Sequence, residues 1–179
     1  MDLVPGLKQL EGQLSLTGDR VAVIKGKLED LLFRAQRIAA AAKNNMKDND
    51  TMYTYDLQNF RRDIRTFGME ITTLPGLLAS LERSAAYDPN AGKFATGVMR
   101  GASRVANSLK SLHDMSLLAH QHIRATDQKM LAWYIAQEIE EMAQKGLGMP
   151  ATANKIVVAV STPPVAPPPG PSSPPPAAG

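Results

Sequence analysis

The sequence predicts an all-α protein, an elongated up-down-up antiparallel three-helix bundle that ends in a disordered, Pro-rich tail. Apolar residues recur at alternating steps of three and four through most of the first 148 residues, which is typical of coiled-coil-like seams between helices. Nine of the 13 prolines fall between residues 161 and 179. The chain has 179 residues, of which 44% are hydrophobic, so it is long enough for one domain with a core.

The first helix is predicted over residues 7–42 by a sustained seven-residue repeat. Such a repeat indicates a narrow apolar seam against a neighbouring helix. Gly12, Gly18 and Gly26 weaken the helix in this region. Only Thr17 departs from the apolar pattern along the seam, which is formed by Leu7, Leu10, Leu14, Thr17, Val21, Ile24, Leu28, Leu31, Ala35, Ile38 and Ala42.

The second helix is predicted over residues 53–85, after a polar turn at residues 43–51. Pro75-Gly76 lies inside this repeat, and a proline removes one backbone donor and clashes one turn back. The apolar stripe keeps its phase across the proline, so we expect a kink and not a chain reversal.

A third helix is predicted to start at Asp88, as its N-cap, with Pro89 at the first helical position. Its stripe starts at Phe94, and small residues at 97 and 101–103 allow close helix approach. Short connections favour antiparallel neighbours, and the first hairpin then places Asp63 beside Arg34.

Residues 126–146 could either extend the third helix or form a separate one. A third helix that continues through them would outrun the other two at 1.5 Å per residue. Either a break at residues 125–127 starts a short fourth helix that folds back, or the exposed end packs against another copy or another protein. We expect Trp133, the single tryptophan, to be buried in either case. The candidate protein-binding residues are Leu131, Trp133, Tyr134, Ile135, Ile139 and Met142.

The C-terminal part divides into two further segments. Gly146, Gly148 and Pro150 mark the end of the helical bundle, residues 1–148. Residues 149–160 form a short β-prone segment, because residues 155–160 read KIVVAV, and such a segment can add a strand to a partner's sheet. Residues 161–179 form the disordered tail. Its Pro164–Pro167 spacing matches peptide ligands of the PxxP type, although a spacer is the favoured interpretation.

Basic residues form one cluster in the expected hairpin register. Arg34, Arg37, Arg61, Arg62 and Arg65 are candidate anion-binding residues for phosphate or anionic lipid. Acidic residues interleave with them in the sequence, so pairing within the chain is the favoured interpretation.

Residues 131–142, LAWYIAQEIEEM, resemble the ferritin helix in which a tryptophan precedes an acid-rich stretch. The resemblance implies Glu138 and Glu141 as carboxylate ligands of a di-iron centre. Ferritin-like centres also use Glu-x-x-His motifs. The residues three before His113, His120 and His122 are lysine, leucine and alanine, so no such motif is present and we expect no metal or other cofactor.

The remaining chemistry is sparse. Because cysteine is absent, disulfides, thiol nucleophiles and zinc–thiolate sites are excluded. No phosphate-binding loop, dinucleotide turn or nucleophile elbow is present, so we expect neither an enzyme nor a small-molecule substrate. A formal net charge of +3 is too small to favour nucleic acid.

These observations predict a non-enzymatic protein-interaction, scaffold or assembly subunit that binds a partner protein or forms a homo-oligomer. One alternative is a helical translocator or appendage-associated subunit. Another is an amphipathic coat on a membrane or granule, although the sequence contains no motif that identifies such a coat. No apolar run is long enough to span a membrane, and no cleaved signal peptide is evident. We therefore expect a protein that is cytoplasmic or exported without such a signal.

Overall fold

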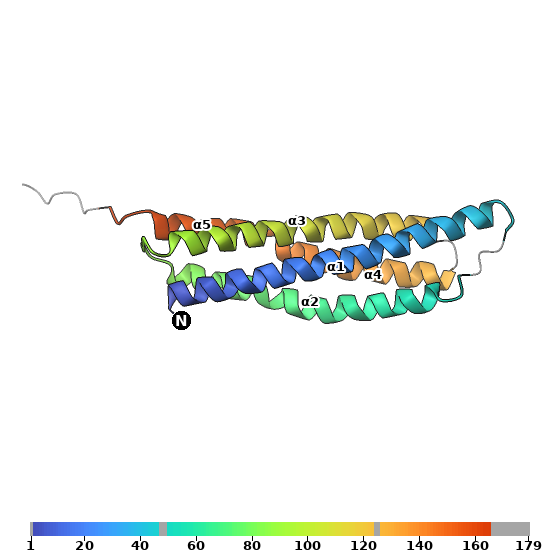
Figure 1. The fold of residues 1–179 in the computed structure, drawn as a ribbon, viewed down its shortest axis with the longest axis horizontal. Helices are drawn as coiled ribbons and strands as arrows, with labels where there is room; N and C mark the ends of the chain where they lie inside the picture. The colour runs from blue at the N-terminus through green and yellow to red at the C-terminus, as the bar shows by residue number, and fades with distance from the viewer. Residues whose placement is uncertain (1, 47–49, 124–125, 166–179) are drawn as a thin grey trace, which may run out of the picture.

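The computed structural model describes residues 2–46, 50–123 and 126–165 of the chain, with the side chains of residues 126 and 127 excepted. These ranges contain five helices and no strand, which confirms the predicted all-α, elongated bundle (Figure 1). The helices are α1 (Leu3–Lys43), α2 (Tyr53–Ser84), α3 (Gly92–His122), α4 (Thr126–Leu147) and α5 (Met149–Ser161). The tail predicted for residues 161–179 lies outside the described residues from residue 166 onward.

The helices form four rods, because α4 and α5 follow one another along the same side of α3 (Figure 1). α1 and α3 run in one direction, and α2 and the α4–α5 rod run back. α1 packs against α3 and α2, and the α4–α5 rod also packs against α3 and α2. α2 and α3 therefore occupy opposite corners, although they are consecutive in the chain. α1 begins and α5 ends at the same end of the bundle.

The third rod ends at residue 122, so the long helical overhang considered from the sequence does not form. α4 folds back between α2 and α3 and supplies the fourth helix that the sequence left open. The apolar stripe of residues 131–142 thereby completes the core of this chain. This arrangement is the first of the two alternatives, in which a break near residues 125–127 starts a new helix.

The β-prone segment predicted for residues 149–160 is wrong, because these residues form α5. The helix follows a break at Gly148, and Pro150 lies in its first turn, where the missing N–H has no helical partner to lose. The buried residues of α5 are spaced by four, three and four, which is a helical period. This period outweighs the β propensity of valine and isoleucine. The buried set is Met149, Ala153, Ile156 and Val160.

The connection from α2 to α3 differs from the expectation in detail. α2 continues through Pro75 without a reversal, as its unbroken stripe indicated. α3 begins at Gly92, about one turn after the predicted Asp88 cap. The Asp88 carboxylate instead accepts a hydrogen bond of 2.9 Å from the Asn90 N–H. The Asp88 N–H donates to the Val160 carbonyl at 3.1 Å, so this connection is tied to the end of α5.

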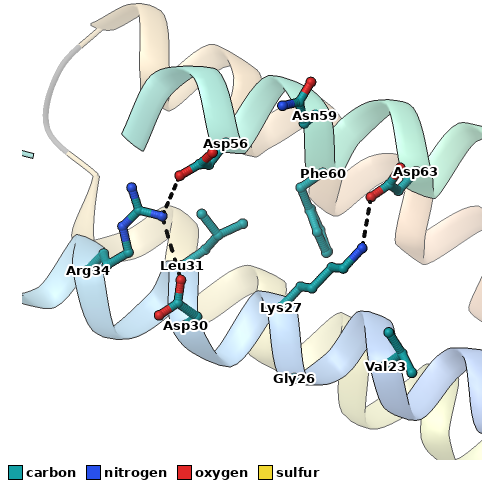
Figure 2. A pocket seen from close by; sticks show the side chains of 10 residues that line it. All are labelled: Val23, Gly26, Lys27, Asp30, Leu31, Arg34, Asp56, Asn59, Phe60 and Asp63. Atoms are coloured by element: carbon teal, nitrogen blue, oxygen red, sulfur yellow. Dashed lines mark hydrogen bonds and ion pairs between the residues drawn. The ribbon is translucent and has the colours of Figure 1, made fainter. Parts of the chain in front are cut away.

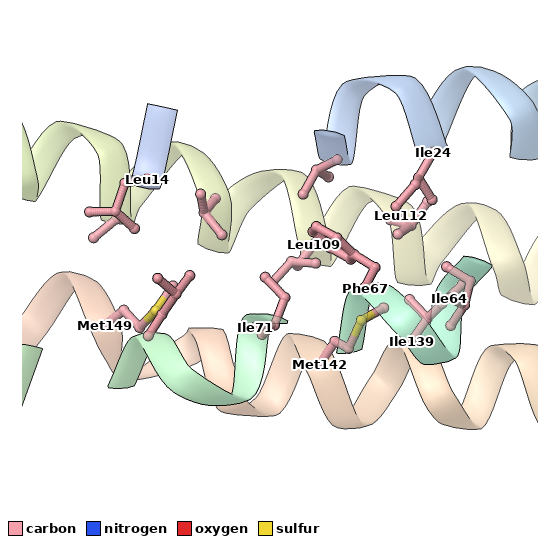
Figure 3. Packing of buried hydrophobic residues seen from close by; sticks show 14 of the residues in the cluster. Leu14, Ile24, Ile64, Phe67, Ile71, Leu109, Leu112, Ile139, Met142 and Met149 are labelled. Atoms are coloured by element: carbon pink, nitrogen blue, oxygen red, sulfur yellow. The ribbon is translucent and has the colours of Figure 1, made fainter. Parts of the chain in front are cut away.

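The core is a continuous column of apolar side chains along all four rods (Figure 3). Nearly all predicted seam positions of α1 and α2 are buried in it. Ile38 and Ala42 are not buried, because they lie on the last turns of α1, which project beyond the other rods (Figure 1). The hydroxyl of Thr17 is buried and has no hydrogen-bond partner in the part of the chain that the structure describes.

Glycine brings α1 and α3 close together. A β-carbon on Gly101 of α3 would lie 2.9 Å from the β-carbon of Leu14, and one on Gly18 of α1 would lie 2.8 Å from the Arg104 guanidinium. The small residues noted in the sequence of α3 therefore permit the tight packing of α1 against α3. The α1–α2 seam is the looser one, and ion pairs span part of it.

Candidate binding surfaces

The α2–α4 side of the bundle carries an exposed group of aromatic and basic residues. Trp133 of α4 is 47% exposed and Tyr134 is 39% exposed. Their rings meet edge to face, with centroids 5.2 Å apart. The Arg61 guanidinium lies 4.7 Å from the Tyr134 ring centroid. We define the aromatic–basic face as Arg61, Arg62, Arg65, Met130, Trp133 and Tyr134.

The six protein-binding residues predicted from the sequence divide between the core and the surface. Ile135, Ile139 and Met142 are buried among α2 and α3, so they are unavailable to a partner. Leu131 is half-buried against the same core. Only Trp133 and Tyr134 remain largely exposed, because they lie on the opposite side of α4 from the apolar stripe. The expectation that Trp133 is buried is therefore not met within this chain.

Glu138 organises the basic side of this face. Its Oε1 accepts hydrogen bonds from Nε of Arg65 at 2.9 Å and from Nε of Arg61 at 3.3 Å. Its Oε2 is buried and has no hydrogen-bond partner within residues 2–46, 50–123 and 126–165. Beside it, Arg61, Arg62 and Arg65 line a hollow of about 300 Å³ together with Gln58 and Leu131. No ion pair of Arg62 is seen in the described part of the chain, and its side chain faces solvent.

The five candidate anion-binding arginines do not form one cluster. Arg61, Arg62 and Arg65 lie toward α4, whereas Arg34 and Arg37 pair with Asp50, which lies three residues before α2. Arg34 also donates to Asp56 at 2.8 Å. The pKa of Asp50 is lowered, mainly by its hydrogen bond with Arg34, and the pKa of Arg34 is raised by the same contact. Arg34 and Arg37 are thus engaged by carboxylates of this chain.

A second surface lies between α1 and α2, where three cations of α1 meet three carboxylates of α2. Both rows have a seven-residue spacing, so the pairs recur every two turns along the antiparallel seam. We call this set the charge ladder: Arg20–Glu70, Lys27–Asp63 (3.3 Å) and Arg34–Asp56 (2.8 Å). The sequence interpretation placed Arg34 beside Asp63, which is two turns from the observed register. The matching seven-residue spacing of opposite charges could have identified the ladder.

The charge ladder spans a groove along the outer side of α1 and α2. Figure 2 shows Phe60 of α2 and Leu31 of α1 between the Arg34–Asp56 and Lys27–Asp63 pairs. Two adjoining hollows of about 550 and 510 Å³ follow the groove, and both are lined by Val23, Lys27 and Asp63. Among the described residues, a β-carbon on Gly26 would meet no atom within 4 Å, so this part of the groove is open.

A smaller cavity of about 190 Å³ lies where the last turns of α1 project past the other rods. It is lined mostly by alanine and isoleucine, with Tyr53, His122 and Gln128 as its polar members. The Tyr53 hydroxyl is buried and has no hydrogen-bond partner among the described residues, and burial raises the pKa of Tyr53 to about 12. The cavity thus combines apolar walls with one buried hydroxyl.

No cluster of three or more histidine or acidic side chains that could hold a metal ion is found in the part of the chain that the structure describes. Glu138, which the ferritin resemblance placed as a ligand, is held by two arginines. Over the same residues, every helix is too short or too polar to cross a membrane.

Comparison with known proteins adds no assignment. No protein-family model matches the chain, and neither does any curated protein or any solved structure.

Proposed function

We propose that this chain is a non-enzymatic protein-interaction module, which binds a partner protein through the aromatic–basic face. The observation that carries the proposal is the exposure of Trp133 and Tyr134 on a helix whose apolar stripe is already buried. Trp133 remains 47% exposed and Tyr134 39% exposed, so a partner that covers this apolar surface gains the free energy of its burial.

The composition of the face supports a protein partner. Tryptophan, tyrosine and arginine are the residues most enriched at the energetic centres of protein interfaces. All three occur here within about two turns of α2 and α4. A complementary partner surface has an aliphatic patch that contacts Trp133. Around this patch it has acidic side chains that pair with Arg62 and Arg65.

A comparison of two exposed aromatic residues tests this proposal. The variant Trp133→Ala/Arg62→Glu removes the anchor and reverses one charge on the face. The matched control is Tyr87→Ala, because Tyr87 is 46% exposed on the α2–α3 connection, away from the face. Wild type and control should recover the same co-purifying protein from the native cell, quantified by mass spectrometry, and the face variant should lose it. Equal recovery by all three proteins would refute the proposal.

The single tryptophan gives an independent readout with a purified partner. Burial of Trp133 in the interface should shift its fluorescence to shorter wavelength in proportion to the complex formed. A partner that binds with no change in Trp133 emission contacts a different surface. Truncations for these assays should keep α5, because its residues belong to the core.

A further inference from the structure

The outer side of α1 and α2 carries exposed apolar side chains that none of the described residues covers. Grouped exposed apolar residues beside a groove mark an interaction surface. We propose that a second copy of the chain covers this side, in a two-fold dimer whose axis runs parallel to the bundle. Val23 of α1 is exposed and lines both hollows of the groove, and Leu16, which is also exposed, lies two turns before it on α1.

The arrangement of charges in the ladder favours a second copy of the chain as the partner and indicates its orientation. All cations of the ladder lie on α1 and all carboxylates lie on α2. A two-fold axis parallel to the bundle places α1 of one copy against α2 of the other at the same level. Each cation then faces a carboxylate of the second copy. An axis across the bundle would instead place α1 against α1, with cations facing cations, which is strongly unfavourable.

Residues that line the groove lie at matching levels in the same orientation. The ladder sets the levels, since seven residues along α1 correspond to seven residues back along α2. In the proposed dimer, Val23 lies within one residue of the level of Thr66 of the second copy, which is about 1.5 Å along the axis, and both residues line the groove. The open space at Gly26 leaves room for side chains that enter the groove.

Charge reversal at the central pair tests the dimer by sedimentation of the full chain. Lys27→Glu and Asp63→Lys each place like charges together at this level in a homodimer, so each should weaken association by about tenfold or more. An equimolar mixture of the two variants restores opposite charges across the interface and should dimerise again. Lys129→Glu changes charge at an exposed position of α4, outside the face, and should dimerise like wild type.

Cysteine cross-linking tests the direction of the axis, and the chain is suited to it because it has no native cysteine. Val23 lies near the level of Thr66, and both side chains are exposed. A mixture of Val23→Cys and Thr66→Cys chains should form a disulfide-linked dimer on oxidation. Val23→Cys alone should not, because the two α1 helices occupy opposite corners of the proposed interface.

Three results would overturn the proposal. These are a wild type that sediments as a monomer at its highest soluble concentration, a mixture that fails to restore association, and self-linking of Val23→Cys. The first is also the result expected if a different protein occupies the groove. Trp133→Ala should leave dimerisation unchanged, so failure of the dimer and failure of the aromatic–basic face as a binding site can be told apart.

Discussion

Arg34 of α1 holds Asp50, three residues before α2, through two hydrogen bonds of 2.7 Å, one from Nε and one from Nη2. A guanidinium and a carboxylate form two parallel hydrogen bonds when they lie in one plane, so the pair restricts the orientation of Asp50. It therefore fixes the position at which the chain enters α2. Arg37 also donates to Asp50 at 3.0 Å. The contact therefore joins the end of the α1–α2 loop to both arginines of α1.

Asp50→Asn should lower the free energy of unfolding by about 1–2 kcal/mol at pH 7, because it removes the charge that both arginines share. The folded-state pKa of Asp50 is lowered, so its contribution is present above the unfolded value, about 3.9, and is lost as pH falls through the folded pKa. Urea unfolding at pH 7 and pH 3 should show a smaller difference between variant and wild type at pH 3. An equal difference at both pH values would contradict the assignment.

Thr17→Val should raise the free energy of unfolding by about 1 kcal/mol, because it replaces an unpartnered buried hydroxyl with a methyl group of similar size. Thr17→Ser is the matched control, since it keeps the hydroxyl and removes the methyl, and it should destabilise the protein. Thermal unfolding followed by circular dichroism measures both changes. Destabilisation by valine would mean that the hydroxyl has a partner in solution.

Gly101→Ala should lower the free energy of unfolding by about 1–2 kcal/mol, because its β-carbon would overlap Leu14 across the α1–α3 contact. Gly12→Ala is the control within α1. Its β-carbon would meet no atom within 4 Å, so the higher helix propensity of alanine should stabilise the protein by about 0.5–1 kcal/mol. Chemical denaturation separates the two variants by the sign of their effects.

Ile139→Ala should lower the free energy of unfolding by about 2–4 kcal/mol, because Ile139 is fully buried. Trp133→Ala, less than two turns away on the same helix, should change it by less than about 1 kcal/mol. Denaturation of the two variants in parallel distinguishes the core side of α4 from its exposed side. A large loss from Trp133→Ala would show that Trp133 is a packing residue.

Alkaline pH should destabilise the protein in part through Tyr53. Its folded-state pKa of about 12 is above the unfolded value of about 10, so its contribution is fully present below pH 10 and is lost as pH rises toward 12. Tyr53→Phe keeps the ring and removes the ionisable hydroxyl. Between pH 9 and pH 11.5, the variant should lose less stability than wild type. Tyr87→Phe, at an exposed position, should behave like wild type.

Seven-residue periodicity was sufficient to predict the first two helices and their buried faces, because burial follows apolar spacing almost directly. The same periodicity is present in α5, where Met149, Ala153, Ile156 and Val160 have helical spacing, but the valine-rich composition led to the prediction of a β-prone segment. Period was the better guide, since a helix packed on one face tolerates β-branched residues.

The binding surfaces were harder to predict because exposure depends on how the rods are arranged. Trp133 and Ile139 both belong to an apolar-rich segment. Ile139 is buried and Trp133 is exposed because α4 packs between α2 and α3 with the Ile139 side facing them. The predicted register of α1 against α2 differs from the observed one by two turns. A polar loop does not show where its turn lies, so the register could not be derived from it. The seven-residue spacing of opposite charges on α1 and α2 would have fixed it.

The placement of the beginning of α1 and the end of α5 at one end of the bundle determines how the molecule responds to mechanical load (Figure 1). Tension applied between residues 3 and 161 acts across the rods and not along them, so it pulls one contact apart at a time. The bond from the Asp88 N–H to the Val160 carbonyl lies at that end and is among the first to carry the strain. Such a geometry yields at low force, by peeling.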